Sequence, residues 1–423
     1  MQNSYRTGPT LETIPTELKL EIASHLDPDV PLDSRWSEMA QHEAQSRRPA
    51  LRSLSLVSRS WAAALAELRW QTLRLRAADT ESLLEIARDW VPRYGTRVKT
   101  LVLVWWTQDD IGDLRRISRT PQRQQAIDAA KRFIGPEIPP APDLNIFFKQ
   151  HDALIATILR ACSNLVELKV IQETDTTHFA RRNEGIELWV GLTKAALQQI
   201  IGRIASADLF FEGNSTPFES SGGAIGSLNL VPNVKHLGVH LGCLAFPAGM
   251  HGLFDAVFAA QQLLSLELHN VDIAAGLDLP HHLTTLILSG IPDLNLRQLA
   301  NILTSRPVVS LCLRAFSISD DQTSGYSPGN LQIEQLSISG STPSMPLEFF
   351  DSAPLKIVEL VASRRGGSDL ISPERVVAFV KKHRKTLLSF KIDRALLAPS
   401  ADVSAINRSL EEEGISVRVV TVE

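Results

Sequence analysis

The sequence has few cysteines and no long apolar run. Its 423 residues include three cysteines, Cys162, Cys243 and Cys312, and no CxxC pair, so it offers neither a disulfide framework nor a zinc motif. No stretch approaches 18 uninterrupted apolar residues, and residues 1–10 have neither an apolar signal core nor an Arg-rich transit pattern. We therefore expect a soluble intracellular protein, cytoplasmic or nuclear.

An excess of charge of one sign is also lacking. The chain has 43 Lys and Arg against 47 Asp and Glu, a formal net charge of −4, and its pI is near 6.3. Proteins organised around nucleic acid or acidic membranes usually have a basic excess. We expect neither as a partner.

Motifs for cofactor, metal or nucleophile chemistry are scarce. The sequence contains no HExxH and no GxxxxGK[ST]. His236 and His240 are four residues apart, but VKHLGVH has the pattern of a strand and not of a helix that would align two ligands. Neither Cys162 nor Cys312 has an identifiable His–Asp partner. We expect no catalytic residue, metal or cofactor.

One short pattern, apolar-x-x-apolar-x-apolar, recurs from about Trp70 to the C-terminus. Its last three positions alternate like a short strand with one buried face. In the second half of the chain the central positions recur at intervals of 20 to 32 residues. The central residues of the ten clear copies are Leu73, Leu101, Leu168, Leu237, Leu266, Leu286, Leu311, Leu336, Val358 and Phe390.

Helix signals lie between the copies. Residues 151–161, 193–206 and 294–305 are helix-like, and Ser372-Pro373-Glu374 supplies an N-cap, a first-turn proline and an early acid to a further helix. Strands that alternate with helices need crossover connections, so the sheet should be parallel. A single unit cannot bury its apolar face, so the units should stack. A doubly wound α/β domain is the alternative.

The array is irregular in its first half. Leu101 and Leu168 are 67 residues apart, and Leu168 and Leu237 are 69 apart. Either divergent repeats or insertions must occupy these gaps. Residues 107–145 have the composition of a polar insertion with a short helix, residues 212–224 form a Gly/Ser-rich loop, and the tail around Val417 alternates like a closing edge strand.

Residues 11–75 have a different, helical periodicity. One apolar stripe recurs every four residues after Thr13, a candidate N-cap, and a second stripe follows after a gap. The first stripe is Ile14, Leu18, Ile22 and Leu26, and the second is Leu51, Leu54, Val57 and Trp61.

These residues carry a resemblance to a known family. IPTELKLEIASHLD and LRSLSLVSRSWAAALAELRWQTL resemble an F-box, and the later strands resemble the repeats of F-box/leucine-rich-repeat proteins. Residues 28–50 depart from the family, which has a short connection there. The positions that match the F-box pattern are Ile14, Pro15, Glu17, Leu18, Ile22, Leu26, Val57, Ser58, Trp61 and Trp70.

The resemblance implies a fold and a domain order. Residues 1–10 would be a flexible N-terminus, residues 11–75 an all-α three-helix F-box-like module with the 28–50 insertion, and residues 76–423 a leucine-rich-repeat solenoid with a parallel sheet and outer helices. The fold class is then α/β.

The resemblance also implies a function: a non-enzymatic substrate receptor of an SCF-type cullin–RING ubiquitin ligase. The module would bind the adaptor subunit, and through it a cullin, while the repeats would hold a target protein. The alternative is an adaptor-independent repeat scaffold, in which the helical faces pack on the first repeats. The implied adaptor-binding residues are Ile14, Pro15, Leu18, Ile22, Leu26, Leu51, Leu54, Val57 and Trp61.

The repeat pattern also predicts where a target would bind. Residues between the buried leucines face outward and line the concave side of a curved solenoid. Their mixed, sign-balanced chemistry suits a protein epitope, whereas an enzyme on an α/β scaffold would instead need a deep pocket. The predicted residues are Glu167, Lys169, His236, Ser265, Glu267, Thr285, Ile287, Ser310, Cys312, Gln335, Ser337, Ile357, Glu359, Ser389 and Lys391.

Overall fold

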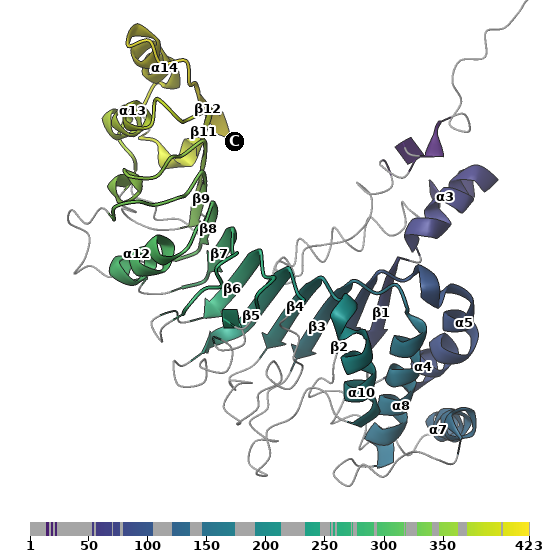
Figure 1. Ribbon diagram of the computed structural model, residues 1–423. Helices are drawn as coiled ribbons and strands as arrows, with labels where there is room; N and C mark the ends of the chain where they lie inside the picture. Colours follow the sequence, from purple (N-terminus) through teal and green to yellow (C-terminus); the bar gives the residue numbers. More distant parts are fainter. Residues whose placement is uncertain are drawn as a thin grey trace, which may run out of the picture.

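The chain adds one strand after another to a single sheet. The described residues contain twelve strands, all parallel, and their order in space, β1 to β12, is their order in sequence (Figure 1). The computed structural model describes residues 14–16, 18–19, 22, 53–54, 56–69, 71–76, 79–104, 121–135, 146–173, 191–212, 233–245, 254, 257–258, 260–271, 273, 277–291, 294–316, 318, 328–340, 347–362, 370–398 and 401–422. A doubly wound sheet reverses its strand order at a switch point, and this sheet does not.

The strands are short, from four residues in the last to ten residues in the fifth. They are β1 (Thr72–Arg76), β2 (Thr100–Val104), β3 (Glu167–Glu173), β4 (Ser206–Glu212), β5 (His236–Ala245), β6 (Ser265–Val271), β7 (Thr285–Ser289), β8 (Ser310–Arg314), β9 (Gln335–Gly340), β10 (Ile357–Ala362), β11 (Ser389–Asp393) and β12 (Val419–Val422).

The register places equivalent residues of every repeat side by side. Leu73 is opposite Leu101, Leu101 opposite Leu168, and the row continues through Leu286 to Phe390. A second row begins at Leu75. All ten central residues predicted from the sequence are buried, and burying such a side chain contributes about 1.5–3 kcal/mol. The prediction of a parallel sheet with one leucine-lined face is confirmed.

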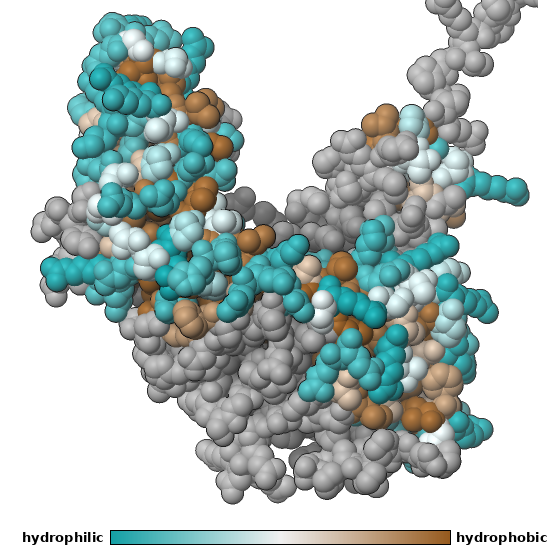
Figure 2. Space-filling model, in the orientation of Figure 1, coloured by the Kyte–Doolittle hydropathy of each residue, from teal (hydrophilic) through white to brown (hydrophobic). Residues whose placement is uncertain are grey.

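Apart from the first helix, the described helices lie on the leucine-lined side at the two ends of the sheet, on the outside of the curve (Figure 1). Figure 2 shows mainly hydrophilic side chains on the outside of the arm formed by the last three helices. The α-helices are α3 (Arg59–Arg69), α4 (Thr80–Glu85), α5 (Val91–Tyr94), α7 (Pro121–Ile134), α8 (Ile146–Ala161), α10 (Gly191–Ile200), α12 (Leu296–Ser305), α13 (Pro373–Lys382) and α14 (Val403–Glu412), with short 3-10 or π segments η2 (Ile86–Trp90), η3 (Gly95–Arg97), η4 (Ile201–Arg203), η9 (Leu347–Phe350) and η10 (Arg394–Leu396).

Side-chain caps fix where several helices begin. Ser372 accepts from the backbone N–H of Arg375 at the start of α13, which confirms the predicted N-cap. The buried Asp152 of α8 does the same for a neighbour, because its carboxylate accepts from the N–H groups of Leu192 and Thr193 in the first turn of α10. This contact satisfies two donors that a helix N-terminus leaves open.

The 69-residue gap contains a divergent repeat that the sequence pattern did not reveal. Strand β4 lies there, with Ala207 in the central position and Leu209 after it. The helix predicted over residues 193–206 is therefore wrong at its end: α10 stops at Ile200, η4 follows, and Ser206 already begins the strand. Alanine at the central position removed the leucine signal.

The 67-residue gap is filled by helices among the described residues. Helix α7 lies within the predicted polar insertion 107–145, and α8 begins earlier than the predicted residue 151. The closing edge strand forms as β12, and the first strand, β1, begins at Thr72, inside the range 11–75 assigned to the helical module. Residues 1–10, 28–50 and 213–224 lie outside the described part of the chain. None of the described helices is long and apolar enough to cross a bilayer.

Candidate binding surface

The face of the sheet opposite the leucines, here called the inner face, carries the predicted target-binding residues in register. Glu167, His236 and Ser265 share one row across β3, β5 and β6, while Lys169 and Glu267 belong to the next row. The rest of the first row is Thr285, Ser310, Gln335, Ile357 and Ser389, and the rest of the second is Ile287, Cys312, Ser337, Glu359 and Lys391. These side chains are half-buried or exposed.

A polar network joins three neighbouring strands on this face. His236 in β5 lies 3.3 Å through Nε2 from Asp208 Oδ1 in β4 and 3.1 Å through Nδ1 from Ser265 Oγ in β6. Beside it, Glu167 accepts from the Thr100 hydroxyl and pairs with Lys169 at 3.1 Å. The carboxylates at the centre of the inner face are thus engaged by neighbours on the same face.

The network shifts the ionisation of its members. The hydrogen bond to Asp208 raises the pKa of His236 despite the opposing effect of burial. Burial alone would raise the pKa of Asp208, but the hydrogen bond from His236 and the positive charges of His236, Lys169 and His240 together outweigh it, so the Asp208 pKa is lowered. The pair is therefore biased towards its charged form.

An aromatic and apolar cluster lies next to the network. The His240 ring stacks on Phe210 with centroids 4.1 Å apart, and His269 lies 6.0 Å from His240. Phe210 is buried with Val104 and Ile171 in a core separate from the leucine rows. The centre of the inner face is thus polar on one side and apolar on the other.

Gly238 allows the polar network and the aromatic cluster to lie side by side. A Cβ at this position would overlap Asp208 Oδ1 and would lie 3.0 Å from His240 Nε2. The absence of a side chain lets the Asp208 carboxylate and the His240 imidazole converge over the strand.

His240 is expected to make folding stability depend on pH. Burial lowers its pKa from 6.5 to about 4, so between these values the unfolded chain binds a proton that the folded chain does not. Stability should therefore be full above pH 6.5 and fall towards pH 4, by about 3 kcal/mol. Urea unfolding at pH 7 and pH 4.5 measures this loss, and it should be smaller in His240→Asn.

His236 acts with the opposite sign and serves as the comparison. Its raised pKa gives a contribution that is present below 6.5 and is lost as the pH rises through its folded pKa. His236→Asn should therefore retain the acid-side loss. Equal acid-side losses in wild type and His240→Asn would contradict the assignment to His240.

Asp208, His236 and Ser265 are hydrogen-bonded in the order of the Asp–His–Ser triad of a serine hydrolase. The surrounding backbone does not suit that chemistry. An acyl transfer needs free N–H donors for the oxyanion, whereas the N–H groups of Leu264 and Ser265 both donate to the Lys235 carbonyl. A GxSxG sequence, Gly325 to Gly329, also occurs, but it precedes β9 and not the helix that a nucleophile elbow requires.

Metal and thiol chemistry find little support in the described residues. No group of three or more His, Cys, Asp or Glu side chains among them could hold a metal ion. Burial raises the pKa of the Cys162 thiol to about 12, which keeps it protonated. Cys312 lies on the inner face between Ile287 and Ser337.

Sequence reasoning missed the middle of this surface. Asp208 and Phe210 belong to the unrecognised strand β4, and His240 and His269 lie beyond the short pattern on strands that continue further than it indicates. A search that allowed alanine at the central position would have found Ile204, Ala207 and Leu209.

The helical module presents a second surface. Trp61 of α3 is 1% exposed and is buried with Leu65 against Ile14 and Leu54. Trp61 thus supports the module from inside, and its indole is not open to solvent in this structure. Lys19 donates from Nζ to Ser60 Oγ at 2.8 Å, which ties the first helical stripe to α3.

Other predicted adaptor residues are open to solvent. Leu18 is 49% exposed, Ile22 41% and Val57 50%, and Pro15 is exposed as well. Leu56, beside Val57, is 80% exposed. Leu26 and Leu51 lie outside the described residues.

Comparison of the chain with models of protein families and with curated proteins finds no match.

Proposed function

We propose that this chain is a non-enzymatic substrate-recognition subunit of an SCF-type ubiquitin ligase. In this proposal the helical module is an F-box that binds the adaptor subunit, and through it a cullin. The repeats are leucine-rich repeats whose inner face holds a target protein. The observation that carries the proposal is the exposed apolar pair Leu18 and Ile22 on a module whose own core is filled by Trp61.

Exposed apolar side chains at helical spacing support a docking role. Leu18 and Ile22 are four residues apart and so lie on one helix face. Leu56 and Val57 add exposed apolar surface beside the same small core. Contiguous exposed apolar surface of this kind commonly marks a protein interface.

The chemistry of the inner face supports a protein as the target. Its charges are mixed, and short-range partners within the face balance most of them, as in Glu167 with Lys169 and Asp208 with His236. The apolar cluster around Phe210 adds contact area of the kind that interfaces bury. Curved repeat sheets use such surfaces to bind other proteins.

Co-expression of the full chain with the adaptor subunit tests the proposal. A stable complex that elutes as one species in size-exclusion chromatography is the expected result. No complex at micromolar concentrations of both proteins would contradict it. Affinity purification followed by mass spectrometry then identifies the target in the same experiment.

The second candidate is an adaptor-independent scaffold, and the position of residues 28–50 favours it. This insertion separates the two apolar stripes where the F-box family has a short connection. Deletion of residues 28–50 distinguishes the adaptor-binding proposal from the scaffold proposal. Under the first proposal the deletion leaves adaptor binding intact, whereas binding that appears only after the deletion supports the scaffold.

A further inference from the structure

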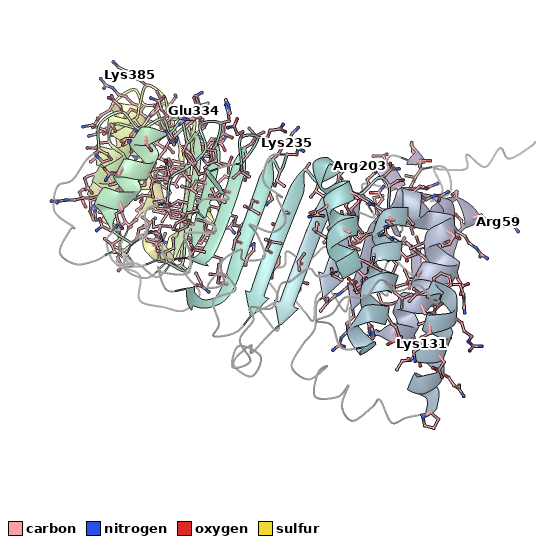
Figure 3. All side chains as sticks on the ribbon, turned by 60° about the horizontal axis from the view of Figure 1, so that its bottom comes forward. Arg59, Lys131, Arg203, Lys235, Glu334 and Lys385 are labelled. Carbon is pink, nitrogen blue, oxygen red and sulfur yellow. The ribbon has the colours of Figure 1, made fainter. Side chains whose placement is uncertain are left out.

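The edge of the sheet where the strands begin is basic over one part of its length. Five segments that precede β2 to β6 form this part: residues 95–99, 160–166, 201–205, 233–235 and 260–264. They contain no Asp or Glu. Their cations, all exposed, are Arg97, Lys99, Arg160, Arg203 and Lys235. Figure 3 shows Arg203 and Lys235 at this edge, and we call these five segments the basic rim.

The basic rim is held rigidly by hydrogen bonds between successive repeats. The carbonyl of Lys99 accepts from the N–H groups of Val166 and Glu167, and the carbonyl of Lys235 accepts from those of Leu264 and Ser265. Side chains add cross-links, because Arg203 Nη1 donates to the Ser163 carbonyl at 2.9 Å. The spacing between rim side chains is therefore set by the sheet.

Exposed apolar side chains alternate with the cations. Lys99, Val166, Ala205, Lys235 and Leu264 each immediately precede a strand, from β2 to β6 in order. Val166 is 44% exposed and Leu264 is 43% exposed. From β2 to β6, the residue directly before each strand is thus a cation, an apolar residue, a small residue, a cation and an apolar residue.

The distances between the rim side chains predict the residue pattern of a peptide that could bind there. Strands lie about 4.8 Å apart, so Lys99 and Lys235 are about 14 Å apart, as are Val166 and Leu264. An extended polypeptide rises about 3.3 Å per residue, so about four residues span this distance. A strand-like segment that runs across the strand starts would match the rim with an acidic residue at every fourth position and an apolar residue beside it.

The positive charge of the basic rim favours an acidic protein segment as its ligand. Within the described residues Lys99 and Lys235 form no ion pair, and Glu167, which directly follows the rim segment 160–166, is paired with Lys169. Surfaces for single-stranded nucleic acid combine a continuous basic track with aromatic stacking platforms, and the five rim segments contain no Phe, Tyr or Trp. The chain as a whole carries a net charge of −4, so the rim is a local exception.

We propose that the basic rim binds an extended acidic segment of a partner protein, with carboxylates on Lys99 and Lys235 and apolar side chains on Val166 and Leu264. This site lies at the edge of the sheet where the strands begin, and it uses none of the residues assigned to the inner face or to adaptor binding. It does not depend on whether the chain binds an adaptor.

A fluorescent peptide, (Glu-Leu-Ser-Ser) repeated three times, tests the site with the full-length chain by fluorescence anisotropy. We expect saturable binding that weakens as salt rises. Charge reversal in Lys99→Glu with Lys235→Glu should weaken binding at least tenfold, and Val166→Ser with Leu264→Ser should weaken it about three- to tenfold. Arg384→Glu with Lys385→Glu makes the same change of charge on exposed residues before β11 and should leave binding unchanged.

Three outcomes would overturn the proposal. One is no saturable binding of the peptide, and another is equal weakening by the Arg384 and Lys385 control. The third is tighter binding of a 20-nucleotide oligothymidine, or of vesicles with phosphatidylserine, that the Lys99 and Lys235 variant abolishes. Every substituted side chain is exposed, so the circular dichroism spectrum of each variant should match that of wild type. A changed spectrum would show that the rim side chains support the fold, which would also contradict the proposal.

Discussion

Leu18→Asp together with Ile22→Asp is expected to abolish co-purification of the chain with the adaptor subunit. Both side chains are about half exposed and lie outside the small core around Trp61. Because each side chain is already about half buried, completing its burial at an interface would contribute about 1–1.5 kcal/mol, and an aspartate placed there must also lose its hydration. The combined loss corresponds to a more than hundredfold weaker complex. Pull-down with purified adaptor, followed by titration calorimetry, measures it.

The chain offers a matched control for this variant. Leu388 is 75% exposed and Val420 is 51% exposed, and both lie at the other end of the sheet. Leu388→Asp with Val420→Asp makes the same chemical change without touching the module, and adaptor binding should persist. If both double variants bind as wild type does, the proposed adaptor surface is wrong.

Leu286→Ala is expected to destabilise the fold by about 2–5 kcal/mol. Leu286 is fully buried at the centre of β7, between Leu266 and Leu311 in the leucine row. Truncation leaves a cavity that the flanking repeats cannot close, because their own positions are fixed by the register of the sheet. Urea unfolding followed by circular dichroism measures the loss.

Ile287 is the control for Leu286, because it is the next residue of the same strand but lies on the inner face. It is only partly buried, so Ile287→Ala should cost less than about 1 kcal/mol. The same two variants separate stability from binding, since Ile287→Ala should weaken binding of the target while Leu286→Ala mainly lowers the free energy of unfolding. Equal destabilisation by the two substitutions would contradict the one-sided burial of the sheet.

The helix and strand content followed closely from local pattern. The apolar triplets located ten strands, since alternation around a buried leucine is a property of a few consecutive residues. The cap at Ser372 fixed the start of α13 for the same reason. The pattern failed at Ala207, because a strand can keep its place through hydrogen bonds to both neighbours even when its central side chain is small.

The candidate surfaces were predictable only in outline. Alternation identified which residues face away from the leucines, so Glu167, His236 and Ser265 were found together. The contact of His236 with Asp208 was not, because it joins residues 28 positions apart through a strand that the pattern did not show. The division of the helical stripes into a core at Trp61 and an exposed pair at Leu18 and Ile22 likewise required the packing of distant segments.

By itself the sequence determined the repeating unit: a short strand with two inward apolar residues, a connection that is often helical, and a parallel arrangement. Local hydrophobic spacing and the need to bury one face are sufficient for that. Only the tertiary structure decided which side chains share a neighbourhood, because the register of the sheet brings together residues from separate repeats. That register placed His240 against Phe210 and aligned Lys99 with Lys235 along one edge.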